Sequence, residues 1–231
     1  MFVYEMHQHT MGCSACAIAD PVQTVKALHE AGFAGMVMTN HFYHGNTGIR
    51  RHQPWDSFVA AYEQAYELAR WAGDALDFDV LFGIEEGVRG GKEVLIYGIT
   101  PTFLYAHPHW DRREKEEPLL PKISKLVREA GGLVIQAHPF RVRDYIDQPW
   151  EELPKEFLDG METYNVHNSP MENIRAENYA RENGLIAIAG TDAHDQTVTD
   201  RAGIACDHRL RDGQALVEVL KSGNYSLWKS E

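Results

Sequence analysis

"FVYEMHQHT", residues 2–10, joins an apolar run to two histidines, His7 and His9, that stand one residue apart. The apolar run predicts a strand over residues 2–6. Alternate residues of a strand point to the same side, so both imidazoles should face one place. Two neutral imidazoles converge in this way on a metal ion or by coincidence, and further ligands at the same place would decide between the two.

Seven apolar runs of this kind predict strands. They cover residues 2–6, 35–39, 80–84, 94–98, 133–137, 160–164 and 185–189. Runs such as "GMVMT" (35–39) and "LVIQA" (133–137) are apolar throughout. Such runs are typical of parallel strands that are buried on both faces.

Amphipathic stretches between these runs predict helices. They lie within residues 19–32, 57–73, 120–132, 169–184 and 212–223. In the first, Asp20 is a typical N-cap, Pro21 fits the first helical position and Gly32 ends the helix. Alternating strands and helices indicate parallel β/α units. Seven units in 231 residues favour a closed or nearly closed barrel, with an open doubly wound sheet as the alternative.

Composition and charge limit the functional classes. The chain is 44% hydrophobic and 24% charged, as in ordinary globular proteins, and its formal net charge is −12. That charge argues against wrapping long nucleic acid, whereas a short phosphorylated ligand is compatible with bound divalent cations. Three cysteines, Cys13, Cys16 and Cys206, fit a reducing cytosol better than a disulfide framework. Without a membrane-length apolar run or a basic leader, we expect a cytoplasmic protein with no membrane partner.

Metal-ligand residue types follow six of the seven predicted strands. The polar residues at these strand ends are, in chain order, His7 and His9, Asn40 and His41, Glu85 and Glu86, His138 and Arg141, Asn165 and His167, and Asp192 and His194, and each pair includes at least one histidine or carboxylate. The carboxyl ends of barrel strands form one face, where active sites lie. If the pairing of His7 and His9 were a coincidence, the residues at the other five strand ends would have to be coincidences as well. Together these residues therefore predict a site for Zn, Mn or Fe ions.

Five ordered motifs carry a resemblance to a known family. "HQHT" (7–10), "TNH" (39–41), "GIE" (83–85), "AHP" (137–139) and "GTDAH" (190–194) resemble the motifs of the PHP (polymerase and histidinol phosphatase) superfamily, and "ALVEVLKSGNYS" (215–226) is similar to its bacterial members. The resemblance covers essentially the whole chain and implies a single domain over residues 1–231. It implies a distorted (β/α)7 barrel with two or three metal ions at the strand C-terminal ends. It also implies phosphoester hydrolysis by metal-bound hydroxide.

The resemblance also implies a ligand set. The first metal would be held by His7, His9, Glu85 and Asp192, the second reached by Glu85 and His138, and the third held by His41 and His194. Three positions depart from the family pattern. Asn40 stands where Asp is usual, Thr100 follows the fourth strand where His is frequent, and the loop at 11–20 offers Cys16 or Asp20 instead of the usual His or acid. Asp20 is better explained as the helix cap than as a ligand. The second and third sites would then lack ligands at the usual positions, and His167, His107 or Cys16 would have to complete them.

Other residues are candidates for substrate binding and catalysis. Arg141, and Arg50 and Arg51 in the loop after the second strand, are predicted to bind a substrate phosphate, with ordinary surface positions as the alternative. Asp192, His194 and Arg141 are the predicted catalytic residues. Residues 107–118 predict a solvated loop at one edge of the site.

The leading hypothesis is therefore a metal-dependent phosphoesterase that cleaves a small phosphorylated molecule, either a monoester or a diester, and acts poorly on long DNA or RNA. An amidohydrolase is the second hypothesis, although no Lys ends the fourth predicted strand to bridge two metals. A non-catalytic metal-binding module with a degraded site is the third, because Asn40 and Thr100 depart from the family pattern.

Overall fold

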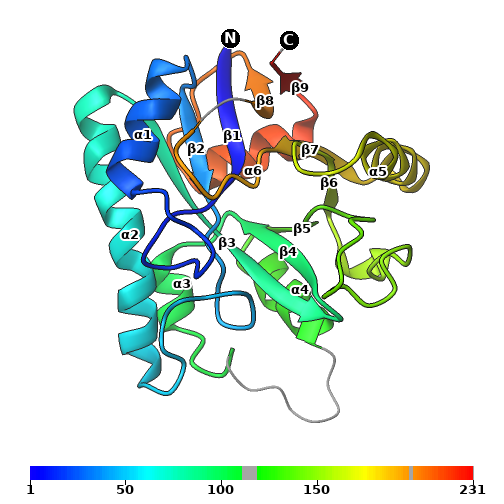
Figure 1. The fold of residues 1–231 in the computed structure, drawn as a ribbon, viewed down its shortest axis with the longest axis horizontal. Helices are drawn as coiled ribbons and strands as arrows, with labels where there is room; N and C mark the ends of the chain where they lie inside the picture. The colour runs from blue at the N-terminus through cyan, green and yellow to red at the C-terminus, as the bar shows by residue number, and fades with distance from the viewer. Residues whose placement is uncertain (111–118, 198–199, 231) are drawn as a thin grey trace.

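A single sheet runs through the computed structural model, which describes residues 1–110, 119–197 and 200–230. Within these ranges the strands are β1 (Phe2–Gln8), β2 (Gly35–Met38), β3 (Asp79–Arg89), β4 (Lys92–Tyr97), β5 (Leu133–Gln136), β6 (Gly160–Asn165), β7 (Ile186–Gly190), β8 (Ala202–Cys206) and β9 (Ser226–Lys229). They pair in the order β7-β6-β5-β4-β3-β2-β1-β8-β9 (Figure 1).

The sheet curls into a nearly closed barrel, as the sequence predicts. Strands β1, β2 and β3 are parallel, and so are β5, β6 and β7. At the carboxyl ends of β1 and β7 the main chain completes the ring, because Asp192 N donates to His7 O over 2.9 Å and His9 N donates to Ala193 O over 3.0 Å. The two strand ends that carry candidate ligands are therefore fixed to each other.

Strand β4 departs from the predicted parallel arrangement, since it is antiparallel to both β3 and β5. The cause is a two-residue turn at Gly90 and Gly91, whose φ values of 56° and 74° are typical of a tight β-hairpin. The start of β4, rather than its end, therefore lies beside the carboxyl end of β3. The antiparallel strands β8 and β9 at the other edge were not predicted.

All five predicted helices are present. They are α1 (Pro21–Glu30), α2 (Trp55–Leu76), α4 (Leu119–Glu129), α5 (Pro170–Asn183) and α6 (Gly213–Ser222), and the short α3 (Pro101–Tyr105) and a 3-10 turn η1 (Lys155–Phe157) were not predicted. Asp20 caps α1, as predicted, by accepting hydrogen bonds from Val22 N and Gln23 N. No helix in the described ranges is both long enough and apolar enough to cross a membrane.

The apolar residues form two main clusters, one outside the barrel and one inside it. The outer cluster packs α1, α2 and α4 against the sheet. The inner cluster includes Tyr4, Leu81 and Ile135 from the strands and Leu216 and Leu220 from α6. Because α6 closes one end of the barrel with apolar side chains, the polar residues gather at the opposite end.

Candidate metal centre

Four side chains meet at the carboxyl end of β1, and each directs a ligand-type atom at the others. His7 Nε2 lies 3.1 Å from His9 Nε2 and 3.2 Å from Glu85 Oε1. His9 Nε2 lies 3.2 Å from both Glu85 Oε2 and Asp192 Oδ1. Donors about 2.0 Å from a tetrahedral metal ion lie about 3.3 Å from one another. The ligand atoms of His7, His9 and Glu85 therefore have the mutual spacing of donors to one ion, and Asp192 lies beside both imidazoles.

The outer nitrogens of the imidazoles are held by acceptors. His7 Nδ1 lies 3.0 Å from Glu162 Oε1, and His194 Nδ1 lies 2.8 Å from the carbonyl oxygen of Asp192. If each Nδ1 donates its hydrogen there, each Nε2 keeps a lone pair for a metal.

Ser14 and Asn40 impose the same arrangement on His9. The Ser14 hydroxyl donates to Asn40 Oδ1 over 3.0 Å, so it has no second hydrogen to offer. It must then accept from His9 Nδ1, which lies 2.9 Å away. Asn40 Oδ1 also accepts from Thr10 N over 2.6 Å. An amide oxygen at position 40 thus orients Ser14, and Ser14 leaves His9 Nε2 free to bind an ion.

A second cluster surrounds Glu85 and includes a residue that the sequence analysis missed, Glu93 on β4. His138 Nε2 lies 3.0 Å from Glu85 Oε1 and 3.5 Å from Glu93 Oε2. His41 Nδ1 lies 2.9 Å from Glu85 Oε2 and 3.2 Å from Glu93 Oε1. Two carboxylates and two imidazoles therefore face a common space, and Glu85 belongs to both clusters.

Two unpaired atoms indicate that this space suits a cation. His41 Nδ1 and Glu85 Oε2 are buried and make no hydrogen bond of normal geometry to any described residue. Burial by itself raises the pKa of Glu85, but His41 and His7 hold that pKa well below its ordinary range. The carboxylate is thus kept charged in a buried position, where a divalent cation would compensate it better than hydrogen bonds do.

A third group consists of the ring nitrogens of His9, His41 and His194, which lie within 4.8 Å of one another. The thiol of Cys16 is within hydrogen-bonding reach of His194 and His41. Burial raises the pKa of Cys16, yet hydrogen bonds with these two rings lower it to about 6. The structure thus places Cys16 beside two of the predicted ligands of the third metal.

Two candidate ligands have unusual backbone geometry. His138 and Asp192 have φ values of 28° and 55°, a region that non-glycine residues rarely adopt. Such conformations cost on the order of 1–3 kcal/mol and occur often at functional sites. Each lies two residues after a strand end, and the side chains contact Glu85 and His7, respectively.

Arg141 is buried against the centre and pairs with Asp192. Its Nη1 donates to Asp192 Oδ2 over 2.6 Å, while Nε donates to Asn168 and Nη2 to Asn165, each over 2.8 Å. Burial raises the pKa of Asp192, but His7, His9 and Arg141 together hold it well below its ordinary range. The described contacts therefore assign Arg141 a role in holding Asp192, and its predicted contact with a substrate phosphate remains a prediction.

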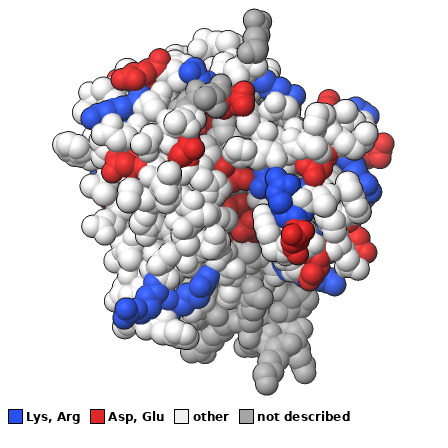
Figure 2. All heavy atoms as spheres, in the orientation of Figure 1, with Lys and Arg blue, Asp and Glu red and all other residues white. Residues whose placement is uncertain are grey.

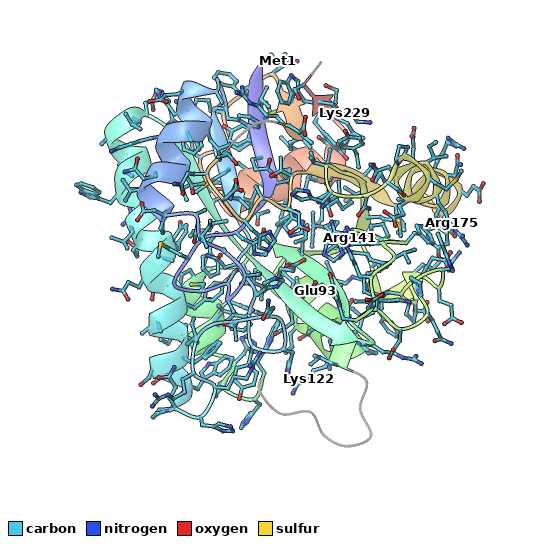
Figure 3. The ribbon with its side chains drawn as sticks, viewed as in Figure 1. Met1, Glu93, Lys122, Arg141, Arg175 and Lys229 are labelled. Atoms are coloured by element: carbon cyan, nitrogen blue, oxygen red, sulfur yellow. The ribbon has the colours of Figure 1, made fainter. Side chains whose placement is uncertain are left out.

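A cavity of about 500 Å³ opens onto these clusters. Its lining includes Cys16, His41, His138, Asp192 and His194, and also Glu93 and Arg141. Figure 2 shows acidic side chains inside a hollow near the middle of this face, with basic side chains beside it. Glu93 and Arg141 both lie in this central region, whereas Arg175 and Lys229 lie toward the periphery (Figure 3).

Comparisons with known proteins give matches in structure alone, since no family model and no curated protein matches the sequence. A two-domain protein from Bacteroides vulgatus, described as containing a predicted PHP-like metal-dependent phosphoesterase, matches with a TM-score of 0.70 and 15% identity over 98% of this chain and 64% of that one. A proposed metal-dependent phosphoesterase from Bifidobacterium adolescentis matches with a TM-score of 0.57 and 15% identity over 94% and 95% of the two chains.

The chain has the PHP-like fold. A third match is the lesion-specific endonuclease PfuEndoQ from Pyrococcus furiosus, with a TM-score of 0.61 and 11% identity over 98% of this chain and 57% of that one. The chain spans 64% of the length of the Bacteroides protein. The resemblance read from the five motifs thus agrees with the fold.

Within this PHP-like barrel, the antiparallel hairpin explains the departure at Thr100. Because β4 runs away from the site, Thr100 lies at the opposite end, where its side chain caps α3 by accepting from Phe103 N. Glu93 at the start of the strand takes the place beside Glu85 instead. The sequence contains a signal for this, since "GVRGGKEV" (87–94) places two glycines between strand-like runs and thus predicts a hairpin.

Two arginines predicted to bind phosphate are not among the residues that line the cavity. Arg51 donates to the carbonyl oxygens of Tyr43 and Gly45 and so stabilises its own loop, and Arg50 is exposed. Besides Arg141, the cavity is lined by two basic residues that were not predicted, Arg89 and Lys92, which lie on either side of the β3–β4 turn. They were missed because the antiparallel direction of β4 was not anticipated.

The remaining candidate ligands differ in position. The His107 ring packs at a tilt against Phe103, and its Nδ1 lies 2.6 Å from the Phe103 carbonyl oxygen, so α3 accounts for its contacts. His167 is half-buried near Asp192 and His194, but it belongs to none of the ligand groups among the described residues. Of the predicted loop at 107–118, residues 111–118 lie outside the described residues.

Two buried residues that support the ligands were also missed. Glu162 on β6 contacts His7 Nδ1 and accepts from His138 N over 2.7 Å. Ser14 orients His9 from the first loop. A glutamate within the buried strand "GMETYN" (160–165) was the available signal for Glu162, whereas no sequence pattern distinguishes Ser14.

Proposed function

We propose that this chain is a metal-dependent phosphoesterase that hydrolyses a small phosphorylated molecule. The observation that carries the proposal is the position of Glu85, whose two oxygens contact His7 and His9 on one side and His138 and His41 on the other. One carboxylate that belongs to two ligand clusters is suited to bridging two ions. Adjacent ions of this kind are common in enzymes that cleave phosphate esters.

The bound ions would supply Lewis-acid polarisation of the phosphoryl group and activation of water. The first would be held by His7, His9, Glu85 and Asp192, and the second by Glu85, Glu93 and His138. Glu162 and Ser14 orient the imidazoles, and Arg141 orients Asp192. His194, whose side chain is 31% exposed, is the candidate ligand most open to a bound substrate.

The size and charge of the cavity support a small anionic substrate. A volume of about 500 Å³ lies in the range of small-molecule sites. Arg89 and Lys92 in its lining would attract a phosphate group, while the net charge of −12 would repel an extended polyanion. We therefore propose nucleotides, sugar phosphates or similar short esters as substrates, with long DNA and RNA as poor ones.

An amidohydrolase activity is the alternative to be tested beside it. That hypothesis needs a lysine that bridges two metals, and Lys92 is the lysine at the cavity. Its Nζ donates to the carbonyl oxygen of Glu151 over 2.5 Å, and no described hydrogen bond or ion pair joins it to a candidate ligand. This position favours the phosphoesterase.

The test is a substrate panel on the full chain after metal removal and reloading with Mn²⁺, Zn²⁺ or Fe²⁺. The panel contains p-nitrophenyl phosphate, bis(p-nitrophenyl) phosphate, short nucleotides, long single-stranded DNA and p-nitrophenyl acetate. We expect metal-dependent cleavage of a small phosphoester and little activity in Asp192→Ala. Faster cleavage of long DNA would contradict the proposed substrate class, and cleavage of the acetate alone would contradict the reaction.

A further inference from the structure

Asn165, the last residue of β6, lies between two side chains that support the first ligand cluster. Its Nδ2 donates to Glu162 Oε2 over 3.0 Å, and its Oδ1 accepts from Arg141 Nη2 over 2.8 Å. Asn165 and Glu162 are fully buried, and Arg141 is 6% exposed. Because both contacts are buried, water does not readily replace either hydrogen bond if it is lost.

An irregularity in β6 brings Asn165 and Glu162 to the same side of the strand. Residues three apart in a regular strand point to opposite faces. The pairing of β6 with β7 shifts by one residue between Glu162 and Tyr164, as at a β-bulge. Asn173 on α5 then holds the main chain, because its Oδ1 accepts from Asn165 N and its Nδ2 donates to Asn165 O. The bulge and Asn173 together direct the amide of Asn165 toward Glu162.

The partners of this amide determine which of its ends donates. A guanidinium cannot accept a hydrogen bond, and an ionised carboxylate cannot donate one. The amide oxygen must therefore face Arg141, where it also accepts from His167 N over 2.9 Å, and the amide nitrogen must face Glu162. Position 165 thus requires a donor and an acceptor on one short, uncharged side chain. An ionised aspartate would supply only the acceptor, and alanine would supply neither.

Through these two contacts Asn165 reaches two candidate ligands that it does not contact in the described hydrogen bonds. Glu162 Oε1 lies 3.0 Å from His7 Nδ1, and Arg141 Nη1 donates to Asp192 Oδ2 over 2.6 Å. His7 belongs to β1, whereas Asp192 follows β7. One amide therefore connects the supports of two ligands that lie far apart in the sequence.

We propose that Asn165 is a positioning residue that keeps His7 and Asp192 oriented toward the same ion. This inference rests on the proposed metal centre. Without the donor at position 165, the Glu162 carboxylate would be less restrained beside His7. Without the acceptor, the Arg141 guanidinium would lose one of the contacts that hold it against Asp192. The affinity of the first site for metal should then depend on the hydrogen-bonding groups at position 165.

Zinc affinity tests this role without a substrate. Metal-stripped full-length wild type, Asn165→Ala and the control Asn173→Ala are titrated with Zn²⁺ in competition with a chromophoric chelator. We expect Asn165→Ala to bind zinc roughly 10-fold or more weakly than the wild type. Asn173→Ala loosens the same strand end but leaves the side chain of Asn165 in place, so its loss should be much smaller.

Two results of this titration would overturn the positioning role while the metal centre stands. They are wild-type zinc affinity in Asn165→Ala, and equal losses in Asn165→Ala and Asn173→Ala. A wild-type protein that binds no zinc would overturn the metal centre and this inference with it.

Asn165→Asp gives a second readout that a purely structural role would not change. A protonated carboxyl group offers a donor and an acceptor, as the amide does, whereas an ionised one adds a negative charge beside Glu162. We expect the zinc affinity of this variant, relative to wild type at the same pH, to be lowest near about pH 8 and to recover toward about pH 6, since two adjacent carboxylates share a proton more readily as the pH falls. The relative affinity of Asn165→Ala should not vary with pH. Wild-type affinity of Asn165→Asp near about pH 8 would overturn the requirement for a donor.

Discussion

Arg141 Nη1 donates to Asp192 Oδ2 over 2.6 Å, and the other oxygen of the same carboxylate lies 3.2 Å from His9 Nε2. Arg141 thus holds Asp192 through one carboxylate oxygen, and the second oxygen of Asp192 faces the candidate metal centre. In Arg141→Ala this restraint is lost, and we expect metal affinity to fall by roughly 10- to 100-fold, with a lower kcat at subsaturating metal. Metal titration and steady-state kinetics measure both effects.

The exposed Arg50, which does not line the cavity, supplies the control variant Arg50→Ala. A higher KM for Arg141→Ala with unchanged metal affinity would contradict the positioning role. That result would instead favour the phosphate-binding role predicted from the sequence.

Ser14→Ala should weaken the first site although Ser14 is not itself a ligand. Without the hydroxyl, His9 Nδ1 loses its acceptor, so the ring is free to rotate or to adopt the other tautomer. We expect metal affinity to fall by roughly 10-fold or more. Asn40→Asp keeps an oxygen acceptor for Ser14 and should retain affinity.

Ser124→Ala is the matched control for Ser14→Ala, because Ser124 is equally buried and its Oγ makes no hydrogen bond to any described residue. Metal affinity is measured for each variant by competition with a chromophoric chelator. If Ser14→Ala binds metal as tightly as Ser124→Ala, orientation of His9 through Ser14 is disproved.

Glu93→Gln should remove a charge from the second cluster and leave the first intact. The carboxylate lies 3.2 Å from His41 Nδ1 and 3.5 Å from His138 Nε2, whereas it contacts neither His7 nor His9 in the described ion pairs. We expect the weaker of two bound ions to be lost while the tighter one remains, as measured by metal analysis after dialysis. Glu129→Gln on exposed α4 surface is the control. Full occupancy of both sites in Glu93→Gln would exclude Glu93 as a ligand.

Glu5 should give the metal-free protein a measurable pH dependence. Burial raises its pKa from 4.5 to about 7, although the N–H groups of Thr191 and His7 lower it. Because the folded-state pKa is the higher one, the stabilising effect of Glu5 is complete below about pH 4.5 and is lost as the pH rises through 7. The full shift corresponds to about 3 kcal/mol.

The Glu5→Gln variant keeps an acceptor for Thr191 N and His7 N but does not ionise. The difference in unfolding free energy between this variant and the wild type should therefore grow in favour of the variant between pH 4.5 and 8. Urea unfolding at several pH values measures it. A difference that does not vary with pH would show that Glu5 titrates normally.

The sequence indicated much of this architecture because its information is local. Continuous apolar runs and recognisable helix caps predict where the strands and helices lie, and their alternation predicts the barrel. The spacing of His7 and His9 predicts that both rings point in the same direction. The direction of β4 depends on a two-residue turn. Because β4 was predicted to be parallel, Glu93, Arg89 and Lys92 were not predicted to lie at the site. The partners of Arg141 and Arg51 could not be inferred, because they come from loops whose paths depend on tertiary packing.

The central claim is that the buried histidines and carboxylates are a metal centre, and the metal content of the protein tests it most directly. The full chain is purified without chelators and analysed for Zn, Mn and Fe beside the double variant His7→Ala/Asp192→Ala. The account predicts at least two ions per wild-type chain, since Glu85 joins two ligand clusters, and a clear loss in the variant. Fewer than one ion per wild-type chain, or equal content in both proteins, would contradict it.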